Sequence, residues 1–379
     1  MNARASQGFP VLQSGTGIAA GRAYLPAEPP HVLWGRLPCR DDKPVATVFP
    51  GQSIIADTVS HEGILEDQGS DPVAFFGRHG IEPGQVLSDT VEIAARRRRD
   101  TRTDGPHVVT GPVAVVGARP GDLLAVHVDA LEMRAPYGVV STRHGRGVLA
   151  GNPLVDAGYS TFCRVIERGD GWAGALPTRR GGTDQATFAL RPFLGIMGVA
   201  TDTSDRAHSV PPGMHGGNMD IKLLTSGSTL FLPVQVPEAL LYIGDPHYAQ
   251  GDGEVALTAL EAPLRAHLTV DVIPRAEVTE HLGQVRGPFA AADGFLIPTG
   301  MDLDLNVALR RCVTNAVNLL VACFGMEPRQ AYLYLSAAGD FHISQAVDLV
   351  AGVHGTMNLA DFATVSPTAL GRRVLESVR

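Results

Sequence analysis

Short alternating runs of apolar and polar residues predict β-strands along most of this chain. The segment 124–129 places leucine or valine at every second position, with alanine, histidine and aspartate between them. That period of two is typical of a half-buried strand. The segment 267–273 alternates in the same way, and residues 230–236 and 240–243 are short runs rich in strand-forming residues. The turn at 120–122 predicts a hairpin between residues 113–116 and the strand at 124–129.

Two helices are predicted near the C-terminus. Residues 303–324 carry apolar side chains at helical spacing, with Asp302 as the expected N-terminal cap and Gly325 as the terminator. A second helix should begin with Pro328 in its first turn and end near residue 339. A strand over 342–347 should follow, and we expect the first helix to pack against a sheet.

The predicted fold is mostly β (α+β): a sandwich or barrel-like core with a few helices, two long ones near the C-terminus. The 43 glycines and 27 prolines among 379 residues agree with many strands and turns. We expect an N-terminal arm over residues 1–28, a β-rich domain over 29–200, and a second β-rich domain over 201–379. The last carries the polar motifs described below and the C-terminal helices.

Composition limits the function classes. A hydrophobic fraction of 44% excludes a disordered chain, and no apolar run approaches the roughly 18 residues that a membrane span requires. The net charge is −8, and aspartates interrupt the arginine run at 96–102, which argues against a nucleic-acid partner. The four cysteines have no paired metal-ligand spacing. We therefore expect a cytoplasmic protein with neither a membrane nor a nucleic-acid partner.

Two glycine-rich polar motifs carry the candidate chemistry. Asp245 and His247 are separated only by Pro246, so on an extended segment both side chains face one side, as two ligands of one ion should. The stretch 251–254 adds a second acidic pair, Asp252 and Glu254. A polar turn with solvated carboxylates would have the same spacing. The motif at 215–220, with His, Asn and Asp around a Gly-Gly step, favours a metal site formed from His215, Asp220, Asp245, His247 and Glu254.

These motifs resemble the acetamidase/formamidase family. The resemblance rests on six segments that occur in matching order: 110–113, 118–124, 215–220, 232–234, 244–261 and 336–348. Residues 31–34 are also similar to the family's N-terminal strand. It implies a β-rich, metal-dependent hydrolase that converts a small amide such as formamide or acetamide to a carboxylate and ammonia. It also implies bound zinc, often calcium as well, and a homodimer or higher homo-oligomer.

The resemblance suggests roles for the polar residues. Zinc held by His and Asp would provide hydroxide at neutral pH and polarise the amide carbonyl. Glu254 or Asp252 could then take the water proton and pass it to the leaving nitrogen. Asn218 could orient the amide, and His215 could be either a ligand or an oxyanion donor.

Three alternatives remain open on the sequence. His61 and Glu62 lie in a polar segment, 60–72, that could belong to the substrate pocket of a hydrolase for a larger amide, or to a capped loop with a charged surface. A non-catalytic, metal-stabilised binding protein for a small amide-like solute could use the acidic motif for calcium alone. Calcium tolerates little histidine, so His215 and His247 favour zinc and catalysis.

Nucleophile-based amidases have little support. The chain has no Gly-x-Ser-x-Gly motif, no cysteine in a recognisable nucleophile context and no His-Glu-x-x-His sequence. We therefore expect hydrolysis by a metal-activated water.

Overall fold

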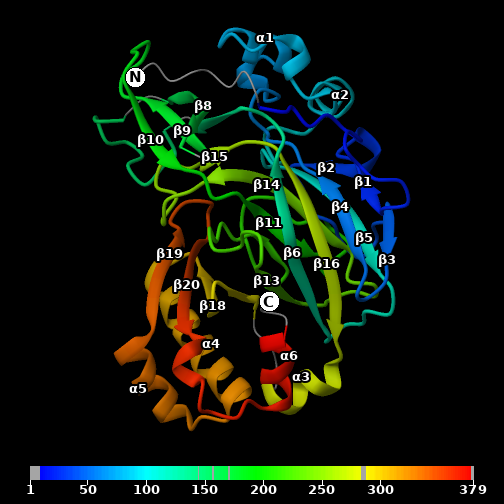
Figure 1. The fold of residues 1–379 in the computed structure, drawn as a ribbon, viewed down its shortest axis with the longest axis vertical. Coiled ribbons are helices and arrows are strands. Elements are labelled where there is room, and N and C mark those ends of the chain that lie inside the picture. Colours follow the sequence, from blue (N-terminus) through cyan, green and yellow to red (C-terminus); the bar gives the residue numbers. More distant parts are fainter. Residues whose placement is uncertain (1–8, 144, 156–157, 170, 283–286, 377–379) are drawn as a thin grey trace.

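A computed structural model describes residues 9–376, apart from 144, 156–157, 170 and 283–286. Within these residues the strands form two large sheets (Figure 1). The nine-stranded sheet has the order β1 (Tyr24–Leu25), β4 (Ser53–Asp57), β16 (Leu264–Ile273), β6 (Leu123–Met133), β13 (Thr229–Pro233), β17 (Phe289–Ala292), β18 (Phe295–Asp302), β20 (Ala351–Asn358) and β19 (Asp340–Gln345).

The second sheet has eleven strands in the described part of the chain. Its main path is β10 (Gln185–Ala189), β9 (Gly171–Pro177), β8 (Ser160–Arg168), β7 (Tyr137–Ser141), β15 (Leu260–Glu261), β14 (Leu241–Ala249), β11 (Phe193–Val199) and β12 (Gly216–Asn218). Off this path, β5 (Val108–Val115) pairs with β14, β2 (Val32–Trp34) and β3 (Ala46–Val48).

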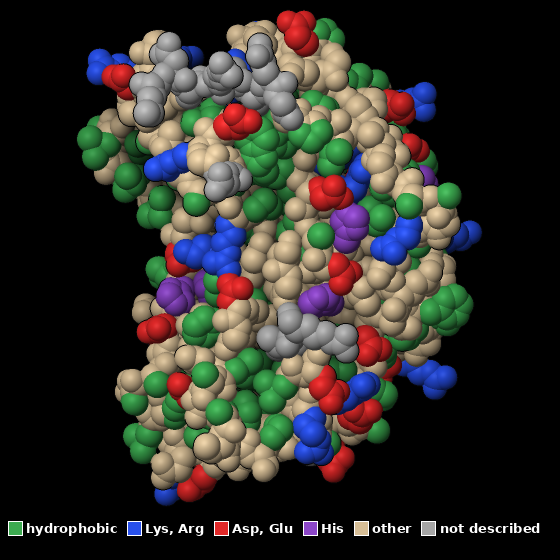
Figure 2. Space-filling view, viewed as in Figure 1, with side chains coloured by type: hydrophobic (Ala, Val, Ile, Leu, Met, Phe, Trp, Pro, Cys, Tyr) green, Lys and Arg blue, Asp and Glu red, His purple; other side chains and the backbone are tan. Residues whose placement is uncertain are grey.

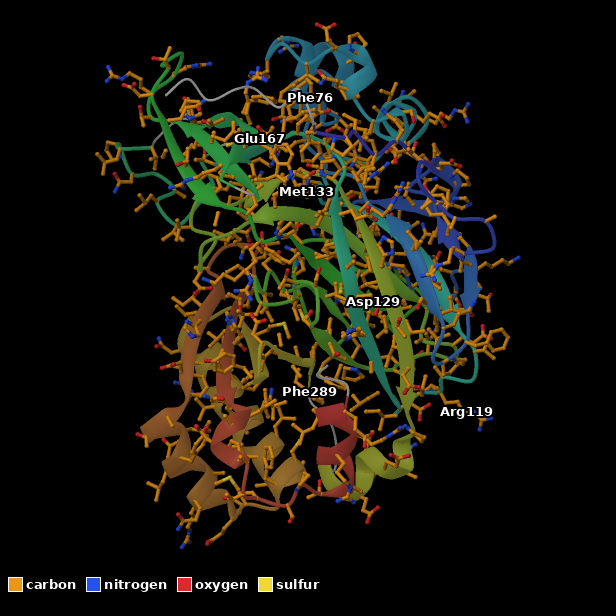
Figure 3. The ribbon with its side chains drawn as sticks, in the orientation of Figure 1. Phe76, Arg119, Asp129, Met133, Glu167 and Phe289 are labelled. Atoms are coloured by element: carbon orange, nitrogen blue, oxygen red, sulfur yellow. The ribbon has the colours of Figure 1, made fainter. Side chains whose placement is uncertain are left out.

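The helices lie at two ends of the molecule. Figure 1 shows α1 (Pro72–Gly77) and α2 (Ser88–Arg96) at one end, and α3 (Arg275–Leu282), α4 (Leu305–Phe324), α5 (Pro328–Ala338) and α6 (Ala369–Glu376) at the other. Short 3-10 turns occur at Pro29–His31, Glu66–Gln68, Pro83–Gln85 and Leu359–Phe362. In Figure 3, Phe76 marks the α1 end and Phe289 lies beside the C-terminal helices, with β6 carrying Met133 and Asp129 between them.

The alternation along β6 explains how the layers assemble. Leu124, Val126 and Val128 belong to the core that joins the two sheets, whereas Leu123 and Ala125 belong to the core beneath the C-terminal helices. A strand presents successive side chains to opposite faces, so β6 is apolar on both sides where it is covered on both. The structure is therefore a sandwich with a helical layer on one outer face, which confirms the predicted mostly β class.

Two local predictions need correction. Residues 113–116 and 124–129 do not form a hairpin, because β5 and β6 belong to different sheets and the turn between them crosses the sandwich. The turn residues predict that the chain reverses direction, but they do not show which strand the following strand pairs with. The helix α4 is capped by Asp304, whose side chain accepts from the backbone of residues 306 and 307, and not by Asp302; Gly325 does end it, at φ 66°.

The helix α4 is the single described helix long and apolar enough, by length and composition, to cross a membrane. Its apolar side chains, among them Ala316, Leu320 and Cys323, pack in the core shared with β13, β17 and β18. This burial identifies α4 as a core helix. On the face shown in Figure 2, charged side chains of both signs are interspersed and do not form one basic patch.

The predicted division at residue 200 stays a prediction. Strands from both predicted segments alternate within the nine-stranded sheet, where β16 lies between β4 and β6. In the predicted N-terminal arm, residues 1–8 lie outside the described residues. Farther along it, the backbone carbonyls of Leu12 and Gln13 accept hydrogen bonds from the buried guanidinium groups of Arg134 and Arg265.

Candidate metal centre

A cluster of buried histidines and carboxylates lies where β14 meets the loops at the edge of β4 and β5. Each side chain is between 0 and 6% exposed: His61, His107, Asp220, Asp245, His247, Glu254 and Glu261. Ionisable groups are rarely buried to this degree unless they are paired or bind a metal. Within the described residues, these side chains form three overlapping groups whose ligand atoms could hold a metal ion.

Strand pairing places the centre of the cluster. His247 on β14 lies opposite Glu261 on β15 in the antiparallel register. The Nε2 atom of His247 is 3.1 Å from Glu261 Oε1 and 3.1 Å from Asp245 Oδ2. Both contacts lack hydrogen-bond geometry, since Nε2 is without a hydrogen-bond partner. These atoms converge on a common point without bonding to each other, as ligands of one ion do.

Two loop histidines complete this side of the cluster. His61 follows β4, and its Nδ1 atom is 3.5 Å from Asp245 Oδ1 and 3.9 Å from Glu261 Oε2. His107 directly precedes β5, and its Nε2 atom is 3.8 Å from Asp245 Oδ1. Asp245 therefore lies between the two loop histidines and His247.

The other side of the cluster is richer in oxygen. Asp220 Oδ1 is 4.0 Å from His247 Nδ1, and Glu254 joins the same ligand group. Asn218 on β12 donates through Nδ2 to Asp348 Oδ2 at 2.9 Å, while its own Oδ1 is buried without a partner. The carboxylates of Asp220, Glu254 and Asp348 thus lie near one another with few internal donors.

The backbone at these acids is unusual. Asp220, Asp245, Glu254 and Asp348 all have left-handed φ values, between 45° and 52°. Aspartate tolerates this region better than most residues, but glutamate does not, and such conformations typically cost about 1–3 kcal/mol each. Asp245 is thus not in the regular extended conformation expected from its spacing to His247, although the two side chains do meet.

Gly195 on β11 leaves the space that these side chains occupy. A Cβ atom at this position would lie 2.5 Å from Asp220 Oδ1, 2.7 Å from His247 Cε1 and 2.9 Å from Asp245 Oδ2. Its neighbours Leu194 and Ile196 pair with β14 on either side of Asp245. The absence of a side chain therefore lets the ligand residues pack against the strand.

The buried polar atoms of the cluster suit a metal ion. Its buried atoms without a hydrogen-bond partner include both ring nitrogens of His61 and of His247, and oxygens of Asp220, Asp245, Glu254 and Glu261. Nitrogen and oxygen ligands about 2.0–2.2 Å from a tetrahedral zinc lie about 3.3–3.6 Å from one another. The separations of 3.1–3.9 Å between the histidines and Asp245 or Glu261 span that range.

The electrostatics favour the same conclusion. Burial, reinforced by neighbouring carboxylates, raises the pKa of Asp220 and of Glu254 well above their usual ranges. Burial also lowers the pKa of His107 to about 4. Burial alone would raise the pKa of Asp245, but His107 and His247 hold this pKa well below its usual range. A divalent cation would stabilise the ionised carboxylates and the neutral imidazoles together.

A cavity of about 810 Å³ opens onto the cluster. His61, His107, Asp245 and Glu254 contribute to its wall. Loops from elsewhere in the chain complete it, with Arg99, Arg143, Leu257 and Leu349 among the other lining residues. The buried ligands are thus accessible to a small molecule.

The structure brings most of the predicted residues together. Asp220, Asp245, His247 and Glu254 lie in the cluster, and Asn218 borders it. His61 joins the ligand groups, and Glu62, 1% exposed, lies beside it with Oε1 3.6 Å from His61 Nε2. Neither residue lies on a charged surface loop.

Two predicted residues lie elsewhere. The ring of His215 packs near Gly213 and Gly217, and the described ligand groups do not include it. Burial lowers its pKa to about 4. Asp252 pairs with Lys222 at 2.9 Å and does not line the main cavity. The apolar run 255–260 after Glu254 is largely a turn, with Val255 62% exposed.

Three members of the site were missed by the sequence reasoning. Glu261 stands inside an apolar run from Ala259 to Leu264, and an acid in such a run is a recognisable signal of a buried role. His107 and Asp348 carry no such signal, because each lies in a loop far in sequence from its partners. Only the pairing of β5 with β14 and the bridge between Gly253 and Gln345 bring them close.

The fold and the cluster define a β-sandwich protein with a metal-competent His/carboxylate site. The Acetamidase/Formamidase family model matches residues 194–360. A formamidase of Methylophilus methylotrophus is 29% identical over 66% of this chain and 75% of that protein. An acetamidase of Mycolicibacterium smegmatis is 54% identical over 63% of this chain and 75% of that protein. The chain belongs to the Acetamidase/Formamidase family.

Solved structures show the same fold. A predicted acetamidase/formamidase from Thermoanaerobacter tengcongensis has a TM-score of 0.69 at 23% identity, covering 91% of this chain and 98% of that one. An acetamidase from Yersinia enterocolitica has a TM-score of 0.70 at 24% identity, covering 92% and 96%. Of the cluster residues, His61 and His107 lie outside the matched family segment.

We predict that Gly195→Ala weakens metal binding by at least about tenfold, because its new methyl group would displace Asp220, Asp245 or His247. Competition with a chromogenic chelator measures the affinity. Gly251→Ala is the matched control, since a Cβ there meets nothing within 4 Å. Equal affinities for the two variants would contradict the assigned ligand set.

A second prediction concerns how His107 is held. Its Nδ1 atom lies 3.1 Å from the hydroxyl of Ser209, which is fully buried. A hydroxyl that accepts from Nδ1–H leaves the Nε2 lone pair facing Asp245. Ser209→Ala should therefore lower metal affinity by about 10- to 100-fold. Ser228→Ala, at another buried serine, should not; wild-type affinity in Ser209→Ala would remove His107 from the ligand set.

Proposed function

We propose that this protein is a metal-dependent amidohydrolase that cleaves the C–N bond of a linear amide to give a carboxylate and ammonia, with formamide or acetamide among its substrates. Membership of the Acetamidase/Formamidase family supports the bond cleaved. The observation that carries the proposal is the set of buried, unpartnered histidine and carboxylate atoms beside an accessible cavity.

The donor set favours zinc at the side that carries the histidines. His61, His107 and Asp245 form one ligand group, and Asp245 with His247 and Glu261 forms the next. Zinc bound there would activate a water molecule as the nucleophile and polarise the amide carbonyl. On the oxygen-rich side, the carboxylate of Asp220 is the kind of ligand that calcium prefers. We propose a cytoplasmic homodimer or higher homo-oligomer as the working form.

Glu254 is the best candidate for the general base. Its carboxylate is buried at the cavity wall, and burial together with the charge of Asp348 raises its pKa well above the usual range. A carboxylate with a raised pKa takes up a proton more readily and can release it to the departing nitrogen. Its unpartnered Oε2 atom is free to accept that proton.

Asn218 and Asp348 would position the substrate. Asp348 accepts from Asn218 Nδ2, which fixes the side-chain amide and leaves Asn218 Oδ1 unpartnered at the cavity wall. An amide oxygen in this position can accept from the N–H groups of a substrate amide. His215 belongs neither to the described ligand groups nor to the cavity wall, which favours a packing role over that of an oxyanion donor.

A non-catalytic binding protein is the rival function. Such a protein could use the same cavity with calcium alone at the carboxylates. Three histidines whose nitrogens face these carboxylates argue for a metal that accepts nitrogen ligands, and hence for catalysis.

The function is tested by ammonia release. Metal-replete protein should release ammonia from formamide or acetamide, lose this activity on dialysis against a chelator, and regain it with added zinc. A broad amide panel that yields no ammonia with metal-replete protein would contradict the hydrolase proposal and favour the binding protein.

Glu254→Gln should lower turnover by at least about a hundredfold while the metal is retained, because the amide keeps the size of the side chain but cannot act as a base. Asp252→Asn is the comparison, since Asp252 pairs with Lys222 away from the main cavity, and it should lose far less. Loss of metal in Glu254→Gln would make Glu254 a ligand. Equal losses in the two variants would reject it as the base.

A further inference from the structure

The cavity above the cluster is far larger than formamide or acetamide requires. Its volume of about 810 Å³ is in the range of pockets that enclose ligands of drug size. A ligand with three or four non-hydrogen atoms would contact only a small part of its wall, and the ceiling on binding energy per atom limits the affinity of so small a ligand. The remaining wall would stay in contact with water, so its chemistry indicates what else a substrate could carry.

Arg143 presents a buried donor without an acceptor at this wall. Its side chain is 9% exposed and lines the cavity. The guanidinium group is paired with the buried carboxylate of Glu62, yet its Nε atom is buried and has no hydrogen-bond partner. A buried N–H group left in this state costs free energy that a ligand oxygen would recover.

Arg99 shows the same feature. It pairs with Glu66 at 2.6 Å and donates to the carbonyls of Asp104 and Gly105, and its Nε atom is again buried without a partner. This side chain is 11% exposed and also lines the cavity. The spare donors of two guanidinium groups thus belong to one cavity.

Most charged side chains of this region are paired. Glu62 and Asp67 form ion pairs with Arg143, Glu66 pairs with Arg99, and Asp104 pairs with Arg36 at 2.7 Å. Arg146 lies on the cavity wall, exposed, and has no ion-pair partner among the described residues. An anionic group on a ligand would meet one unpaired guanidinium group and two others with spare donors.

The rest of the wall suits a short hydrocarbon segment. Leu65, Leu257, Val347 and Leu349 line the same cavity as the cluster and the arginines. Leu349 is 70% exposed in the free protein, so covering it with methylene groups would remove apolar surface from water. The wall thus combines amide-cleaving chemistry, apolar contacts and donors for an anion.

We propose that the substrate class of this site is a primary amide whose acyl chain ends in a carboxylate, a monoamide of a short dicarboxylic acid. This inference rests on the proposed amidohydrolase function. The amide carbon would lie at the metal-competent cluster, the methylene groups along the leucines, and the carboxylate near Arg143 and Arg146. Planar carboxylates match the donor geometry of guanidinium groups. The bond cleaved and the release of ammonia are those of the proposed hydrolysis.

The test compares kcat/KM for substrates of matched length with metal-replete enzyme. Succinamate carries the carboxylate, its methyl ester removes the charge, and butyramide lacks the group. We expect kcat/KM for succinamate to exceed that for the ester by at least about tenfold, the worth of one charge-assisted contact of about 1.4 kcal/mol. The preference should fall as salt is added, because salt screens a partly exposed charge.

Two arginine variants test which side chains cause the preference for succinamate over its ester. Arg146→Gln should reduce the ratio of kcat/KM for succinamate to that for its ester by at least about fivefold, mainly through KM. Arg143→Lys retains a charge opposite Glu62 but lacks the Nε–H group, and it should reduce the ratio in the same direction. Arg329→Gln, at an exposed arginine on α5 outside the cavity, is the matched control and should leave the ratio unchanged.

The outcomes separate the two proposals. Equal kcat/KM for succinamate and its ester would overturn the substrate class while leaving the hydrolase intact, provided that the neutral amides release ammonia. No ammonia from any amide would overturn the hydrolase itself. A preference for succinamate that survives in both Arg146→Gln and Arg143→Lys would overturn the assignment of the anion to these arginines.

Discussion

The rest of the site depends on the burial of several carboxylates and imidazoles that lack partners within the protein. Desolvated carboxylates close to one another repel and would take up protons unless a cation joins them. Among the described residues, Asp220, Asp245 and Glu261 form ion pairs only with histidines and with no lysine or arginine. A bound divalent metal ion is the simplest way to balance these charges, and it converts a destabilising arrangement into a stabilising one when it binds.

The sandwich supplies the rigidity that such a cluster requires. The pairing of β14 with β11 and β15 fixes His247 and Glu261, and Gly195 keeps the space beside them open. Left-handed backbone at Asp220, Asp245, Glu254 and Asp348 turns four carboxylates toward one region, at a cost that the surrounding sheets must offset. Ligand positions set by strands and by tightly constrained turns are more exact than positions on free loops.

The sequence predicted the parts of this arrangement that are local. Alternation identified β6 and β16, and the glycine-rich motifs identified Asp245, His247, Asp220 and Glu254 as close neighbours. The pairing of strands was less accessible, because a turn signal does not show whether the next strand pairs with the previous one or crosses to another sheet, as β5 and β6 do. His107 and Asp348 could not be found for the same reason. His215 packs against two glycines outside the described ligand groups, so its predicted role as a ligand or oxyanion donor stays a prediction.

The most direct test of the account is anomalous X-ray scattering from crystals of protein prepared without chelator, measured on both sides of the zinc absorption edge. The account predicts an anomalous peak within about 2.0–2.3 Å of Asp245 and of at least two imidazole nitrogens from His61, His107 and His247. A map with no peak among these residues, from protein that releases ammonia from amides, would contradict it.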